Sequence, residues 1–326
     1  LSDLNSDGSS YMSIDFSFAQ MMSADLSGSK FSSETNFASA DLSDADLTDA
    51  TVTDMVLKTV ANGLADFTDA NLTRVLLNTV AGATEDGLVD IDFTRADLTG
   101  ADLTGASLEN ANLSGATLIN ATLNATHLEN ADFIGADLTG VTINNHSYLI
   151  DADLTDATLT NATITDSYLQ NALFVNASLS NITVSDSYLQ NSDFQGATFG
   201  ATAAISNSSL QNAQLKGVDL SANNNLSLTT VDLSGAKLNN SDLSGQDLTG
   251  IKLSGADLSG PTILTNTGLA GINLHSVDFS DVDFLGLDLS GADFQNANLT
   301  GADLSGVNLS NANLQGANLT DADLNG

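Results

Sequence analysis

Large apolar residues recur at every fifth position over most of this chain. One long unbroken run extends from Leu88 to Ile143, and Ala usually stands two positions before each large residue. A helix would need apolar residues about every 3.6 positions and a strand about every 2, so neither pattern fits. Gly or Asn in each unit, beside Ser, Thr and Asp, indicates a repeated turn. The unit A-[DN]-L-[ST]-[GN] therefore predicts a chain that turns a corner once per unit.

The same spacing covers nearly the whole chain in several runs. After the run from Leu88 to Ile143 it continues in Leu149–Phe199, Ile205–Leu220, Leu228–Ile263 and Leu269–Leu324, and rougher stretches precede it in Phe16–Phe31 and Phe37–Leu77. Extra residues separate consecutive runs, and we expect them to bulge at corners while the inward apolar column continues. This assignment places Ile263 in the inward column.

Similar strings that recur at a longer distance indicate how many units complete one coil. The string SDSYLQN at 185–191 repeats TDSYLQN at 165–171, and LNTVA at 77–81 repeats LKTVA at 57–61. The two copies of each string lie four units of the repeat apart. These irregular strings therefore predict four units per coil. Equivalent residues of successive groups of four units would then be neighbours on adjacent coils, at about the 4.8 Å spacing of a β-ladder. We call this relation the four-unit rule.

The units ADLTG, ANLSG and ADLSG resemble those of the pentapeptide-repeat family, and the resemblance extends over about 310 residues. It implies an all-β fold, a right-handed quadrilateral β-helix in which the central Leu or Phe and the preceding Ala point inward. We predict a single β-helix of about 15 coils over residues 16–326, preceded by a polar arm or cap at 1–15. A three-sided β-helix is the alternative architecture.

The chain is strongly acidic, with 41 Asp and Glu against 7 Lys and Arg and a formal net charge of −34. This charge would repel nucleic-acid backbones and anionic membranes, so we expect no direct binding to either. Cations and basic proteins are the partners that it favours. The chain has no Cys, which excludes disulfides and thiolate metal sites. No apolar run approaches the roughly 20 residues of a membrane-spanning helix.

Candidate chemistry is sparse, and we predict that the protein is not an enzyme. His127, His146 and His275 occupy different positions of the unit and do not show metal-ligand spacing in the sequence. No nucleophile elbow, zinc-protease or phosphate-loop motif occurs. We therefore expect no catalytic residue, no cofactor and no histidine metal site.

Two columns of side chains stand out under the four-unit rule. Asp283, Asp303 and Asp323 would stack as like charges. One interpretation is a solvated acidic face that opposes aggregation, and the alternative is weak binding of Ca²⁺, because carboxylate oxygens suit this cation. A second column, Tyr148, Tyr168 and Tyr188, would form an aromatic ladder and a contact surface on an otherwise polar molecule.

Three function classes follow from these features. The first is a structural protein that assembles head to tail into an extracellular or cell-surface filament, because the repeat continues through ANLTDADLNG without a polar cap. The second is a DNA mimic, since the resemblance includes family members that bind bacterial DNA gyrase and protect it from quinolones. The third is a generic protein-interaction solenoid. A cytoplasmic location is the alternative to an extracellular one.

Overall fold

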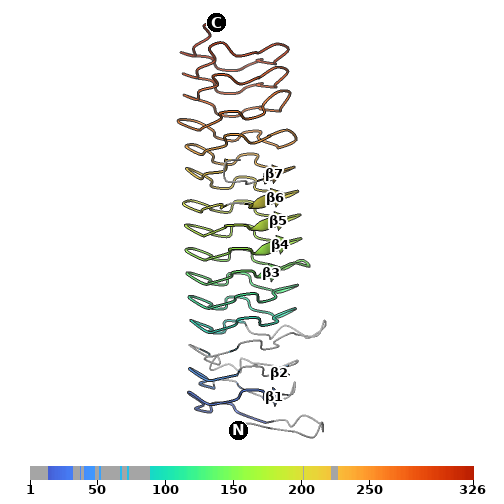
Figure 1. Cartoon of the computed structure of the whole chain (residues 1–326), viewed down its shortest axis with the longest axis vertical. Helices are drawn as coiled ribbons and strands as arrows, with labels where there is room; N and C mark the ends of the chain where they lie inside the picture. Colours follow the sequence, from blue (N-terminus) through green and yellow to red (C-terminus); the bar gives the residue numbers. More distant parts are fainter. Residues whose placement is uncertain are drawn as a thin grey trace. The chain divides into compact units, whose positions relative to one another are not determined.

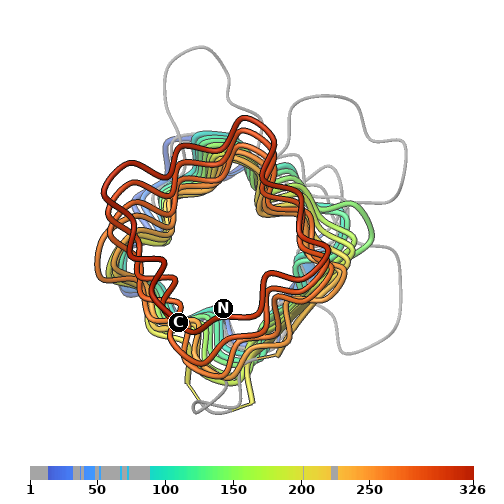
Figure 2. The ribbon, with the colours of Figure 1, turned by 90° about the horizontal axis from the view of Figure 1, so that it is seen from above.

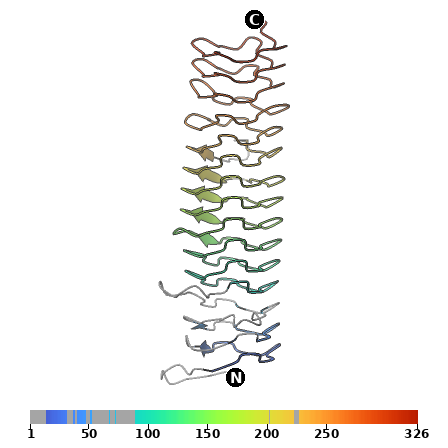
Figure 3. The same ribbon diagram turned by 180° about the vertical axis from the view of Figure 1, so that it is seen from behind.

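A computed structural model of the chain describes residues 14–31, 37, 40–47, 51–52, 67, 72, 89–200, 202–221 and 227–326. The chain divides into two compact units, Leu1–Tyr168 and Leu169–Gly326. Within each unit, successive coils of the backbone stack on one another (Figure 1), and the view from behind shows the same stacking (Figure 3). The view from above shows that the backbone of the coils encloses a space (Figure 2). The side chains of the buried Leu, Phe and Ala residues form the core of each unit.

The register between neighbouring coils confirms the predicted coil length. In the first unit, Asp92 pairs with Asn112 in parallel, and Asn112 pairs with Asp132. In the second unit, Asn273 pairs with Asp293 in the same way. Each partner lies four pentapeptides further along the chain, so four pentapeptides complete one coil.

Within the described ranges, seven short strands are long enough to be named. In the first unit they are β1 (Lys30–Phe31), β2 (Thr51–Val52), β3 (Thr142–Ile143) and β4 (Thr163–Thr165), and in the second β5 (Thr183–Ser185), β6 (Ala204–Ser206) and β7 (Ser227–Thr229). β1 pairs with β2, β3 with β4, and β6 with both β5 and β7, always in parallel. β3, β4 and β5 carry β-branched residues, which favour extended backbone, while the other described coil contacts in these units are mostly isolated bridges.

The polar residues of the repeat make its turn. Asp97 accepts a hydrogen bond from the backbone N–H of Thr99 at 3.0 Å, and Asp102 accepts one from Thr104 at the same distance. Two residues after each inward Leu the backbone is left-handed, as at Gly100 (φ 67°) and Asn110 (φ 56°). Gly and Asn tolerate this conformation better than other residues. The turn therefore accounts for the Asp or Asn at the second position of the unit and for the Gly or Asn at its last position.

The inward assignment of the large apolar residues is confirmed from Phe93 to Ile143, the part of the run Leu88–Ile143 that the structure describes. Leu103 and Leu113 are 0% exposed, as are the alanines at 96, 101, 106 and 111. Burial of one such Leu contributes about 1.5–3 kcal/mol before the entropy cost. Since each coil contacts only its neighbours, the stability of a unit is roughly a sum of such local contributions.

Extra residues bulge outward, as expected. Between Ile143 and Leu149, both fully buried, the additional residue is accommodated at Asn145 and His146, which are exposed and left-handed. The column of buried side chains continues past the bulge, but pairing shifts by one residue, so that His127 pairs with Tyr148.

The inward assignment of Ile263 is wrong. Ile263 is 46% exposed, whereas Leu264 is 2% exposed and continues the column after Leu258. The extra residue lies at the bend that contains Gly260 and Pro261, one pentapeptide earlier than the sequence pattern indicated. Ile263 pairs instead with Asp242, an outward position of the preceding coil.

Several predictions concern segments outside the described residues. These are most of the polar arm at 1–15, the similar segments 57–61 and 77–81, the residue Leu88 that begins the run Leu88–Ile143, and most of the insertion at 221–227.

Candidate functional site

An aromatic column lies on the outer face of the first unit. The rings of Tyr148 and Tyr168 stack with centroids 4.9 Å apart and an interplanar angle of 8°. The imidazole of His127 extends the stack below Tyr148, at 4.8 Å and 15°. Two members of the predicted ladder are therefore together, and a histidine joins them. Tyr188 lies in the second unit, where it is 44% exposed and pairs through its backbone with Ser209.

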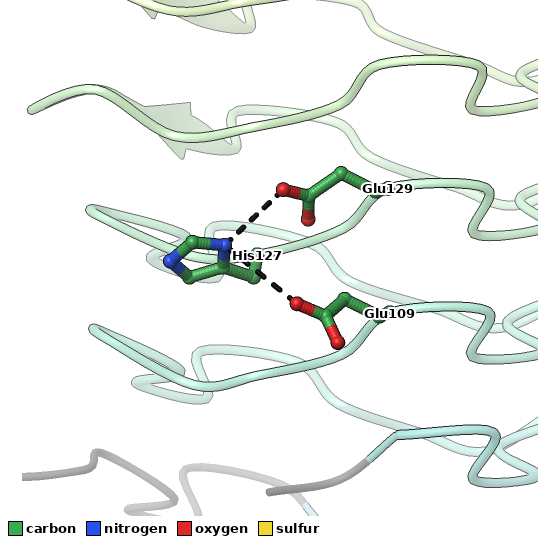
Figure 4. Close-up of side chains that lie close together, drawn as sticks. All are labelled: Glu109, His127 and Glu129. Carbon is green, nitrogen blue, oxygen red and sulfur yellow. Dashed lines mark hydrogen bonds and ion pairs between the residues drawn. The ribbon is translucent and has the colours of Figure 1, made fainter. Parts of the chain in front are cut away.

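His127 also lies between two glutamates on neighbouring coils (Figure 4). Its Nδ1 is 3.2 Å from Oε1 of Glu129 and 3.8 Å from Oε1 of Glu109. One potential ligand atom from each of the three side chains lies within 4.8 Å of the others. Among the residues that the structure describes, this is the only group of three His, Cys, Asp or Glu residues that converges so closely.

The three side chains are partly buried, and one oxygen of the cluster is unsatisfied. The exposed fractions are 43% for His127, 42% for Glu109 and 27% for Glu129. Oε2 of Glu129 is buried and has no hydrogen-bond partner in the described part of the chain. A buried carboxylate oxygen without a partner carries a desolvation cost. A further interaction with this oxygen would therefore stabilise the cluster.

The other two histidines have fewer acidic neighbours. Nδ1 of His146 lies 3.4 Å from Oδ2 of Asp166, which is its one carboxylate contact among the described residues. His275 contacts the hydroxyl of Ser276 and the amide of Asn296. The cluster at His127 was not predicted from the sequence, because the histidines show no metal-ligand spacing along the chain. The available signal was the four-unit rule, which places Glu109 beside Glu129.

The aspartates of the predicted calcium column are in register but do not form a cluster of this kind. Asp303 pairs through its backbone with both Asp283 and Asp323. Each carboxylate accepts a hydrogen bond from its own turn, from Leu285 N at 2.7 Å, Ser305 N at 2.9 Å and Asn325 N at 3.0 Å. Hydrogen bonds from the side chain and backbone of Ser305 lower the pKa of Asp303. These contacts explain the aspartates as turn residues, and Ca²⁺ binding to them stays a prediction.

Ion pairs between coils in the second unit follow the predicted register. Nζ of Lys252 lies 3.2 Å from Oδ2 of Asp232, and Nζ of Lys237 lies 3.7 Å from Oδ2 of Asp257. Burial raises the pKa of Asp232, but hydrogen bonds from Ser234, Gln211 and Lys252 outweigh it and hold this pKa below its ordinary value. The carboxylate therefore stabilises the fold in its charged form.

Replacing Asp232 by Asn is expected to destabilise the protein at about pH 7 by roughly 0.5–1.5 kcal/mol, the usual net value of such contacts. A lowered pKa in the folded state contributes stability above the unfolded-state pKa, and this is lost as the pH falls through the folded-state value. The difference between wild type and variant should therefore shrink below about pH 4. Urea unfolding across this range measures it.

Lys252→Gln is the matched control. It keeps the carboxylate and its contacts with Ser234 and Gln211, and Lys252 itself is 72% exposed, so this variant should lose less stability. A difference between Asp232→Asn and wild type that stays constant with pH would contradict the assignment.

Comparison with known sequences assigns the family. A sequence model described as pentapeptide repeats matches in eight copies, at residues 19–54, 88–115, 111–145, 145–174, 165–202, 227–260, 262–296 and 288–326. The matches cover well over half of the chain, so the protein belongs to the pentapeptide-repeat family, whose members fold as right-handed β-helices. The family consists generally of non-enzymatic structural or interaction proteins. No curated protein matches the sequence.

Solved structures of the same family are similar to this chain. A trypsin-treated form of QnrB1, a plasmid-mediated fluoroquinolone resistance protein, is 24% identical, with a TM-score of 0.29 over 68% of this chain and 88% of that one. HetL of the cyanobacterium Nostoc, which is involved in heterocyst differentiation regulation, is 21% identical, with a TM-score of 0.20 over 94% and 90%. A protein of the Arabidopsis thaliana thylakoid lumen is 28% identical, with a TM-score of 0.16 over 39% and 72%.

Membrane insertion was not expected from the sequence. Within the described ranges, no helix has the length and apolar character that a membrane crossing requires.

Proposed function

We propose that this protein is a structural solenoid that assembles head to tail through its terminal coils. Four pentapeptides per coil support a quadrilateral cross-section, and the length of the chain supports about 15 coils. The observation that carries the proposal is the parallel register between neighbouring coils, in which each coil buries its apolar column against the next and which a second copy of the chain would continue.

The contrast with the preceding coil is sharp. Leu289, Phe294 and Leu299 are 0% exposed, while their counterparts one coil later are all partly exposed. These counterparts are Leu309, Leu314 and Leu319, and Leu324 beyond them is 57% exposed. The difference marks the apolar surface that one coil buries on the next, and association of two copies through their coils would cover surface of this kind.

The backbone at this face is also suited to continued pairing. The N–H of Leu289 donates to the carbonyl of Asn308 at 3.0 Å, and that of Leu299 donates to Asn318 at 2.8 Å. Contact between one end and the other is heterologous, so it would propagate into an open filament instead of a closed dimer.

Charge opposes this association. Two chains of net charge −34 repel each other, and the repulsion is screened over about 8 Å at physiological ionic strength. Salt or Ca²⁺ should therefore promote assembly, and dilute buffer should oppose it. Weak Ca²⁺ binding along the column Asp283, Asp303 and Asp323 would act in the same direction.

Assembly of the 326-residue chain should be seen as light scattering that rises with protein and salt concentration, with filaments in electron micrographs. Replacing Leu314 and Leu319 by Glu should abolish it, because each side chain would place a carboxylate on the apolar end face. Leu285→Glu is the control, since Leu285 is 66% exposed on the side of a coil. Monomers only, in high salt with Ca²⁺, would reject filament formation and favour the interaction solenoid.

A DNA mimic that binds gyrase is the second candidate, and the net charge of −34 favours it. A mimic of this kind must use an electrostatic surface, so its binding should weaken with salt. Inhibition of gyrase supercoiling by the purified protein would favour this candidate over the structural one. The same charge makes other basic proteins a further class of partner.

A filament-forming solenoid would act in an extracellular or cell-surface location, and we include this location in the proposal. A cytoplasmic location goes with the interaction solenoid or the gyrase partner. Fractionation of cells that express the protein, followed by immunodetection, distinguishes the two locations.

A further inference from the structure

We infer that Glu109, His127 and Glu129 form a binding site for a divalent transition metal ion, with Zn²⁺ as the reference ion. The inference does not depend on the proposed assembly. It rests on the convergence of one imidazole nitrogen and two carboxylates from adjacent coils of the first unit, seen in Figure 4.

The distances between the ligand atoms suit such an ion. In a tetrahedral zinc site with bonds of about 2.0 Å, two ligand atoms lie roughly 3.3 Å apart. The separation of 3.2 Å between His127 Nδ1 and Glu129 Oε1 already matches this value. Glu109 Oε1 is 3.8 Å from the same nitrogen and needs to approach by about half an ångström. Its side chain is 42% exposed and can move that far.

Electrostatics favour a cation at this position. Glu109 and Glu129 occupy equivalent positions on neighbouring coils, where two like charges repel each other. The buried Oε2 of Glu129 has no partner in the described part of the chain. A divalent ion would offset the repulsion and offer this carboxylate a second point of attachment.

The imidazole determines which kind of ion fits best. Oxygen ligands alone would suit Ca²⁺ or Mg²⁺, but a nitrogen ligand with two carboxylates is typical of Zn²⁺ and related ions. The ring of His127 is oriented by stacking on Tyr148 at 4.8 Å, as neighbouring groups orient metal ligands in other sites. Three protein ligands on a partly exposed face leave a fourth position for water.

The test is a zinc titration of the intact protein, by isothermal calorimetry and by competition with a chromophoric chelator. The wild-type chain should bind one Zn²⁺ at this site, and His127→Gln and Glu129→Gln should each weaken it at least about tenfold, because each removes a ligand. His146→Gln is the matched control, since His146 has one carboxylate neighbour instead of two. Circular dichroism of each variant verifies that the fold is retained.

A second measurement identifies the ligand atom. Nitrogen-15 NMR of the three histidines should show zinc on Nδ1 of His127, the atom that faces both glutamates, while the signals of His146 and His275 stay in place. Zinc binding that is equal in His127→Gln and wild type would overturn the inference. So would the absence of saturable binding up to about 0.1 mM zinc, or zinc on Nε2 of His127.

Discussion

Replacing Leu113 by Asp should destabilise the first unit by roughly 4 kcal/mol or more, among the largest effects that a single substitution produces. Leu113 is 0% exposed in the inward column. The variant would place a carboxylate among apolar side chains with no partner, at a high desolvation cost. Thermal unfolding followed by circular dichroism should show a transition many degrees below that of wild type, or no folded state at all.

Ile134→Asp is the control for this prediction. Ile134 lies in the same unit but is 42% exposed, so an added charge remains in water, and its effect should stay within about 0.5 kcal/mol. Equal unfolding temperatures for Leu113→Asp and wild type would show that the inward column is wrongly assigned.

Replacing Phe279 by Ala should destabilise the second unit by about 3–5 kcal/mol, the usual cost of removing a buried phenyl ring. Phe279 is 0% exposed and forms an edge-to-face cluster with Phe284 and Phe294, at centroid distances of 5.1 and 6.0 Å. Loss of the ring would also remove aromatic contacts that stabilise the fold beyond the burial of apolar area. Urea unfolding of wild type and variant measures the loss.

The effect of Phe279→Ala should be local at first, because each coil interacts mainly with its neighbours. Hydrogen exchange should accelerate in the coils around Phe279 before it changes in distant coils of the same unit. Leu285→Ala is the control, since Leu285 is 66% exposed and its truncation leaves no cavity. Comparable losses from the two substitutions would contradict the burial of the aromatic cluster.

Local sequence rules predicted most of the described fold correctly. The regular spacing of the repeat identified inward residues such as Leu103 and Leu113, because only those positions can point into a narrow coil. Similar strings that recur after four pentapeptides identified the coil length, since equivalent side chains of these strings lie on adjacent coils. The Asp232–Lys252 and Lys237–Asp257 pairs follow the same rule.

The tertiary structure decided the points where two local choices were equally good. Ile263 and Leu264 are adjacent apolar residues, and either satisfies a spacing rule that allows one extra residue. The bend at Gly260 and Pro261 takes up that residue one pentapeptide earlier, which turns Leu264 inward and Ile263 outward. Spacing along the chain does not contain this information, because it depends on where the backbone bulges.

By itself, the sequence determined the repeat, the coil length and the inward column of this protein, because each depends on regular spacing. Only the tertiary structure brought His127 to both Glu129, its close neighbour in sequence, and Glu109, which belongs to the preceding coil. The bulge at Asn145 and His146 shifts the register by one position, and Tyr148 thereby stacks on the imidazole of His127. A candidate metal site of this kind arises from contacts between coils, and a spacing rule for ligands along the chain does not find it.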